Sequence, residues 1–136
     1  MPRFAANLGH LFTERPLIER FGAAAAAGFP AVELQFPYDI ATSAVVAELQ
    51  KHNLTQLAVN TPMTPESGLA AIPGRERDFA AAFARALDYV TAIGGTGIHC
   101  MTGVVDVNAH GAESRDLNRG QTAGGSLVLP IDFVPN

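Results

Sequence analysis

The stretch "AVELQFPYD" at residues 31–39 is an apolar run of strand character that carries a carboxylate, Glu33, in its middle and closes at Pro37. A buried acid without partners is costly, because its charged form loses its hydration. Glu33 is therefore paired with a basic side chain, placed at the open end of the strand, or part of a functional site. The segments on either side predict the fold on which this choice depends.

A helix is predicted on the N-terminal side, within "TERPLIERFGAAAAAGF" at residues 13–29. Thr13 can serve as its N-cap, Pro16 falls in its first turn, apolar residues recur at helical spacing, and Gly28 ends it. The preceding residues 3–12 are mostly apolar and predict a strand that runs into a loop. Strand, helix and strand therefore follow one another.

The same alternation continues on the C-terminal side. A helix from about Ala41 ends near Asn53, and "TQLAVNTP" at residues 55–62 predicts the third strand. The longest predicted helix, residues 75–95, is followed by a fourth strand within residues 96–107. Because no Asn-Gly hairpin signal separates these elements, the pattern indicates an α/β protein with a parallel sheet.

The composition changes after Val107, which suggests two regions, residues 1–107 and a divergent tail, residues 108–136. Residues 108–126 are rich in glycine and lack apolar periodicity, although a fourth helix is due there. The last segment, "LVLPIDFVPN", has strand-like residues but contains two prolines, so it predicts an edge strand or an irregular tail.

The overall composition excludes several classes of partner. The 136 residues, 48% of them hydrophobic, suffice for one domain, and a net charge of -4 without basic clusters argues against nucleic acid and anionic membranes. The single cysteine, Cys100, excludes a disulfide framework and should face the helices as a small apolar group. Since no apolar stretch reaches the roughly 18 residues that span a bilayer, a soluble cytoplasmic protein is expected.

Polar side chains recur where the predicted strands end. Asn7, Glu33, Asn60 and His99 each stand among apolar neighbours in one of the four strands. The carboxyl ends of parallel strands meet at one edge of a sheet, where the following loops build the site. These four side chains are therefore predicted to face a common pocket.

Each of these residues also has an ordinary structural explanation. Glu33 could pair with a lysine or arginine, His99 could be a hydrogen-bonded core histidine, and Asn60 could form a turn before the next Thr-Pro. Arg75, at a predicted helix start, could lie near an anion or belong to an ordinary first turn. The other three histidines could be surface groups: His10, His52 and His110.

Several phrases of the sequence together resemble one family. "FAANL", "AVE" followed by "FPYD", "LAVNTP", "IPGRE" and "GIHCMTG" are similar to the N-terminal half of hydroxypyruvate isomerases and 2-oxo-tetronate isomerases. These proteins are xylose isomerase-like TIM barrels, and the resemblance covers about residues 3–116. It implies a partial TIM barrel of about four strand-helix units.

The resemblance implies a chemistry as well. These enzymes perform an aldose-ketose type isomerisation of a small hydroxy-oxo acid, hydroxypyruvate to tartronate semialdehyde, with a divalent metal, Mg²⁺ or Mn²⁺. By position, Asn7, Glu33, Asn60 and His99 match residues of the family that bind substrate. The family's metal ligands and proton-transfer carboxylates come from its second half, so no catalytic or metal-ligating residue is assigned here.

The departures from the family pattern shape the functional expectation. A TIM barrel needs eight units and typically about 250 residues, so this chain resembles a truncated or frame-disrupted product, or a fragment. Asp132 lacks the Glu-Pro context of the family's fifth strand and receives no role. We expect little or no isomerase activity, and no metal bound, for this chain alone.

Two alternatives remain open at this point. Open edges at the first and fourth strands predict a homo-oligomer, or a non-catalytic half-barrel that binds a partner, unless the tail folds back as an edge strand. Less favoured is a metal site formed by Glu33 and His99 with His10.

Overall fold

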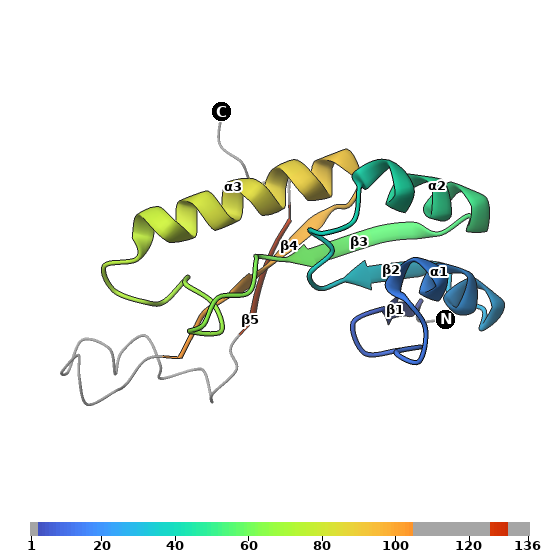
Figure 1. Ribbon diagram of the computed structural model, residues 1–136, viewed down its shortest axis with the longest axis horizontal. Coiled ribbons are helices and arrows are strands. Elements are labelled where there is room, and N and C mark those ends of the chain that lie inside the picture. The colour runs from blue at the N-terminus through green and yellow to red at the C-terminus, as the bar shows by residue number, and fades with distance from the viewer. Residues whose placement is uncertain (1–2, 105–125, 131–136) are drawn as a thin grey trace.

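The computed structural model describes residues 3–104 and the backbone of residues 126–130, and it contains one sheet of five strands in the order β1-β2-β3-β4-β5 (Figure 1). The first four strands are parallel, which confirms the α/β class. The strands are β1 (Ala5–Asn7), β2 (Ala31–Leu34), β3 (Thr55–Asn60), β4 (Gly97–Met101) and β5 (Ser126–Pro130). The helices are α1 (Leu17–Ala26), α2 (Thr42–His52) and α3 (Glu76–Ala92).

All three helices lie on one face of the sheet (Figure 1). Alternate strand residues point toward them and are buried, among them Val32, Val59 and Ile98, and they pack against helix residues such as Phe21 and Val90. The intervening strand residues point to the other face. The same alternation buries Cys100 on the helix side, as predicted, and burial raises the pKa of its thiol.

The start of α1 differs from the prediction, because Thr13 is not its N-cap. The helix begins at Leu17, and Pro16 occupies the N-cap position with no side-chain hydrogen bond. Phe12 has a positive φ of 60°, so the chain turns sharply before Thr13. The loop is held instead by Arg20, whose Nη1 donates to the Leu8 carbonyl at 2.6 Å and whose Nε donates to the Arg15 carbonyl at 2.8 Å.

The helix ends follow the sequence more closely. Asn53 adopts the left-handed conformation, with φ 52°, and caps α2 as predicted. Gly28 and Gly94 have positive φ after α1 and α3, where a residue with a side chain would be strained. These turns return the chain to the sheet.

The edge of the sheet next to β4 is occupied. Strand β5 pairs antiparallel with β4, from Gly97 opposite Pro130 to Met101 opposite Ser126. The fourth strand is therefore not an open edge, and β1 is the outer strand on the other side. The missing fourth helix, His110 and Asp132 fall outside the described residues.

No helix within residues 3–104 has both the length and the hydrophobicity needed to cross a lipid bilayer.

Candidate functional site

The four predicted residues lie in two pairs on neighbouring strands. Asn7 of β1 is the register partner of Glu33 of β2, and Asn60 of β3 is the register partner of His99 of β4. Between the pairs, the register of β2 and β3 shifts near Glu33. Since their strand neighbours are buried on the helix side, all four side chains belong to the other face of the sheet, which no described helix covers and which we call the uncovered face.

The second pair is joined by a side-chain hydrogen bond. Oδ1 of Asn60 lies 3.0 Å from Nδ1 of His99, and Nδ2 of Asn60 donates to the sulfur of Met101 at 3.7 Å. The side chain of Asn60 therefore links β3 to β4 and does not form the local turn that was its alternative explanation. His99 is half-buried, with this one bond to its ring among the described residues.

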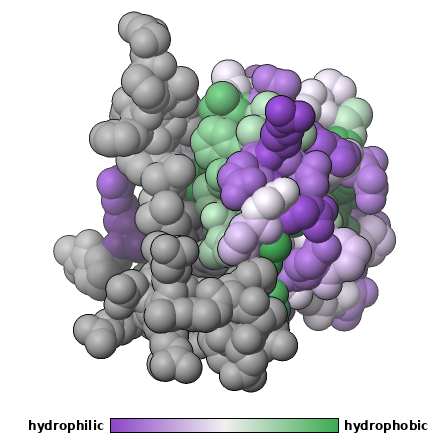
Figure 2. Space-filling model, turned by 90° about the vertical axis from the view of Figure 1, so that its left-hand side faces the viewer, coloured by the Kyte–Doolittle hydropathy of each residue, from purple (hydrophilic) through white to green (hydrophobic). Residues whose placement is uncertain are grey.

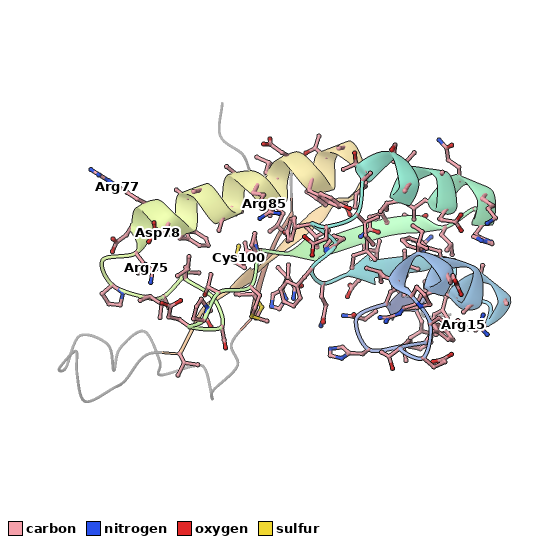
Figure 3. All side chains as sticks on the ribbon, viewed as in Figure 1. Arg15, Arg75, Arg77, Asp78, Arg85 and Cys100 are labelled. Carbon is pink, nitrogen blue, oxygen red and sulfur yellow. The ribbon has the colours of Figure 1, made fainter. Side chains whose placement is uncertain are left out.

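The main chain of Asn60 is held on both sides. Its N–H donates to the carbonyl of Gln35 at 3.0 Å, and its carbonyl accepts a short hydrogen bond from the hydroxyl of Tyr38. The ring of Tyr38 makes an edge contact with the ring of Tyr89, with 5.4 Å between the ring centroids. The guanidinium carbon of Arg85 lies over the Tyr38 ring, 4.8 Å from its centroid. Figure 3 shows Arg85 reaching from α3 toward the sheet.

Glu33 is half-buried, and its carboxylate has no hydrogen bond or ion pair with any residue in the described part of the chain. The explanation that it pairs with a lysine or arginine is therefore not supported there. Its neighbour Asn7 is partly engaged, because Oδ1 of Asn7 accepts the N–H of Gly9 at 2.9 Å and shapes the loop after β1. Glu33 thus offers free acceptor oxygens on the uncovered face.

His10 lies apart from the other candidates. It is exposed, and its Nε2 lies 2.8 Å from the amide nitrogen of Gln35, which connects the loops after β1 and β2. Over residues 3–104, no three His, Cys, Asp or Glu side chains come close enough together to hold a metal ion. The hypothesis of a metal site made by Glu33, His99 and His10 is therefore not supported, and we route no step through a metal on these residues.

Two residues that help to build the site were missed from the sequence. Tyr38 lies within the family phrase "FPYD" and Thr61 within a Thr-Pro pair, and the sequence pattern assigns neither of them to the site. Thr61 is 2% exposed, donates its N–H to the carbonyl of His99 at 2.9 Å, and accepts the N–H of Met101 at 3.0 Å. A hydroxyl directly after a strand that ends in a polar residue was the available signal.

The loop between β3 and α3 is fastened across the end of β4. The N–H groups of Leu69 and Ala70 donate to the carbonyl of Met101 at 3.0 and 3.1 Å, and Gly68 forms an isolated bridge with Thr102. Viewed from the end where α3 begins, hydrophilic side chains cover much of the coloured surface, beside a band of hydrophobic residues (Figure 2). The loop is therefore anchored at the end of β4, the strand that carries His99.

Arg75 at the start of α3 is occupied by protein acids. Its Nη1 lies 2.7 Å from a carboxylate oxygen of Glu66, and its Nε lies 2.6 Å from a carboxylate oxygen of Asp78. Figure 3 labels Arg75 and Asp78 next to each other. Hydrogen bonds from its own backbone N–H and from Arg75 lower the pKa of Glu66. The ordinary explanation of a helix start therefore holds for Arg75, and the anion site is not supported.

A groove of about 530 Å³ lies next to the start of β3, between the C-terminal ends of α2 and α3. Its lining includes Thr55 and Gln56, where β3 begins, whereas the four candidate residues lie toward the strand ends. The groove is therefore separate from the candidate site.

Parallel strands that alternate with helices on one face, and carry polar side chains toward their carboxyl ends on the other, define a segment of a β/α barrel. The chain belongs to the xylose isomerase-like TIM barrel family, whose model matches residues 21–123.

Its relatives carry isomerase names. The chain is 45% identical over 119 residues to the 2-oxo-tetronate isomerase of Cupriavidus necator, covering 85% of this chain and 46% of that protein. It is 39% identical over 107 residues to the hydroxypyruvate isomerase of Escherichia coli, covering 76% of this chain and 42% of that protein. The chain thus spans less than half the length of these curated relatives.

A solved structure supports the fold. The crystal structure named "AP endonuclease, family 2" from Brucella melitensis superposes with a TM-score of 0.73 at 44% identity, over 78% of this chain and 43% of that one. The resemblance to a xylose isomerase-like TIM barrel and the partial-barrel fold are thereby confirmed.

Proposed function

We propose that this chain provides the substrate-binding half of an isomerase pocket that accepts a small hydroxy-oxo acid such as hydroxypyruvate. The observation that carries the proposal is the carboxylate of Glu33 beside Asn7, which has no partner within residues 3–104 and lies on the same face as the Asn60–His99 pair. Isomerase relatives that share this half of the barrel support it.

In this proposal the described residues bind and orient the substrate. The carboxylate of Glu33 accepts a hydrogen bond from a substrate hydroxyl, while the Asn60–His99 pair contacts a second oxygen-bearing group. In a complete barrel of the family, a divalent metal would polarise the substrate oxygens. The described residues contain no group of side chains that could bind this metal. The metal ligands and the proton-transfer carboxylates would therefore come from outside residues 3–104.

Binding tests the role of Glu33. We expect hydroxypyruvate to shift the backbone NMR resonances of residues at the strand ends, with affinity about tenfold weaker in Glu33→Gln, since one charge-assisted hydrogen bond weakens. Glu19→Gln is the matched control, because Glu19 is an exposed acid on α1. Equal affinity for the wild type and Glu33→Gln would refute the assignment.

Activity of the chain alone is a separate part of the proposal. We expect little or no conversion of hydroxypyruvate to tartronate semialdehyde by the purified 136-residue chain, with or without Mg²⁺ or Mn²⁺. A robust turnover that depends on Glu33 would show that the chain holds a complete active site.

A second candidate function is a non-catalytic half-barrel that associates with another copy. The position of β1 as an outer strand and the lack of described helices on the second face favour it.

Nucleic acid is not proposed as a partner despite the endonuclease name of the solved relative, because the net charge is -4. We also propose a cytoplasmic location, which the single free cysteine supports.

A further inference from the structure

His99 has two ring nitrogens in different situations. Nδ1 faces Oδ1 of Asn60 at 3.0 Å, whereas Nε2 makes no hydrogen bond with any residue of the described chain. In a neutral imidazole one nitrogen carries the proton and the other carries a lone pair. Which group the site offers to a ligand therefore depends on the tautomer.

The orientation of the Asn60 amide decides the tautomer. Its NH₂ group donates to the sulfur of Met101 at 3.7 Å, so its oxygen points to His99. Rotating the amide by 180° would place the oxygen against the sulfur, and two acceptors would face each other. Because Oδ1 of Asn60 can only accept, Nδ1 of His99 must donate.

Asn60 has little freedom to escape this arrangement. Its side chain is 8% exposed, its N–H is bonded to Gln35, and its carbonyl is bonded to the hydroxyl of Tyr38. Tyr38 is itself held between Tyr89 and Arg85 of α3. The loop after β2 and the helix α3 therefore fix the backbone from which the amide projects.

We infer that Met101 and Tyr38 are positioning residues that act through Asn60 to keep His99 in its Nδ1–H tautomer, with the Nε2 lone pair presented as a hydrogen-bond acceptor. The carboxylate of Glu33 on the same face is a second free acceptor. A ligand that satisfies both must bring hydrogen-bond donors. Resting on the proposed function, this means that the site binds its ligand by accepting hydrogen bonds from ligand hydroxyl groups, or from the hydrated form of an oxo group.

The tautomer can be read directly by ¹⁵N NMR of the histidine rings. At about two pH units above the ordinary histidine pKa of about 6.5, we expect a pyrrole-like Nδ1 and a pyridine-like Nε2 for His99. The ring signals of His99 are assigned by their loss in His99→Gln. The ring signals of His52 on α2, outside the candidate site, are the internal control. A pyridine-like Nδ1 in the wild type overturns the inference without the need for any variant.

Two substitutions test the positioning residues. Met101→Leu removes the sulfur acceptor at similar volume, and Tyr38→Phe removes the hydroxyl that holds Asn60. In each variant we expect the Nε2–H tautomer to gain population, while a ring spectrum identical to the wild type overturns the role of the substituted residue. Phe83→Leu, a change on α3 outside these contacts, should leave the ring spectrum unchanged.

A ligand comparison separates this inference from the proposed function. Glycerate, with two hydroxyls, should move the Nε2 resonance, whereas propanoate, which has none, should not. If the Nδ1–H tautomer is found but glycerate has no effect, the tautomer assignment stands and the pocket proposal fails. If glycerate binds to a His99 protonated at Nε2, the pocket stands and the tautomer assignment fails.

Discussion

At the scale of single residues, the placement of the candidate side chains followed from strand alternation. A residue flanked by apolar neighbours in a strand covered on one face must point to the other face, and Glu33 and His99 do so. The contact of Tyr38 that holds the Asn60 main chain was not predictable, because it comes from a loop. Tyr38 reaches Asn60 from the loop after β2, across 22 positions of the sequence, by a path that no periodicity encodes.

The hydrogen bonds of Glu66 predict that the stability of the fold depends on pH. Its pKa in the folded chain lies below its ordinary value of 4.5, because of hydrogen bonds from its own backbone N–H and from Arg75. The stability it contributes is therefore present above that ordinary value and is lost as the pH falls through the folded-state pKa. We expect Glu66→Gln to be less stable than the wild type at neutral pH, in urea titrations, with the difference disappearing in acid.

The control for this prediction is Asp88→Asn, which removes an exposed acid of α3 that lies outside the first turn and has no ion pair among the described residues. It should match the wild type across the same pH range. A Glu66→Gln deficit that stays constant into acid would show that the side chain acts through packing and not through its charge.

At the scale of elements, the alternation of strands and helices was predictable, whereas some of their boundaries were not. Asn53 ends α2 because a left-handed residue must follow the last turn, and Asn tolerates that conformation. The prediction of Thr13 as the N-cap was wrong, because the turn at Phe12 and the rigid Pro16 place the start of α1 at Leu17. The tail strand β5 was one of two options, since Pro130 allows only an edge position.

The loop between β3 and α3 contains two glycines that give a matched pair of predictions. Both have positive φ, 131° at Gly68 and 80° at Gly74, but their surroundings differ. A Cβ at Gly68 would lie 2.4 Å from the backbone of Met101, whereas at Gly74 nothing lies within 4 Å. Gly74→Ala should therefore cost only the strain of about 1–2 kcal/mol, while Gly68→Ala should also detach the loop from β4.

Amide hydrogen exchange distinguishes these two outcomes. In Gly68→Ala, the N–H groups of Leu69 and Ala70 should lose protection, because both donate to Met101 next to the clash. In Gly74→Ala their protection should fall only in proportion to the change in global stability. Equal protection in the two variants would mean that the loop does not depend on close contact at Gly68.

At the scale of the whole molecule, the outer strands of the described sheet are β1 and β5, and β1 has main-chain groups that need partners. The N–H of Leu8 donates to the carbonyl of Glu33 in β2, so by alternation the main-chain groups of Ala5 and the N–H of Asn7 point away from the sheet. The carbonyl of Asn7 is already paired, because it accepts the N–H groups of His10 and Leu11. Phe4, directly before the strand, is 68% exposed. An apolar residue beside unpaired main-chain groups favours pairing with another chain.

We therefore predict that the chain self-associates through the β1 edge, as a concentration-dependent increase in sedimentation coefficient. Phe4→Lys should weaken this association, because a charge at a strand edge opposes pairing. Val104→Lys is the matched control, since Val104 is 75% exposed but lies beyond β4, on the other side of the sheet. A wild-type chain that stays monomeric at every concentration, or an equal effect of both lysines, would contradict pairing at this edge and leave only the substrate-pocket proposal.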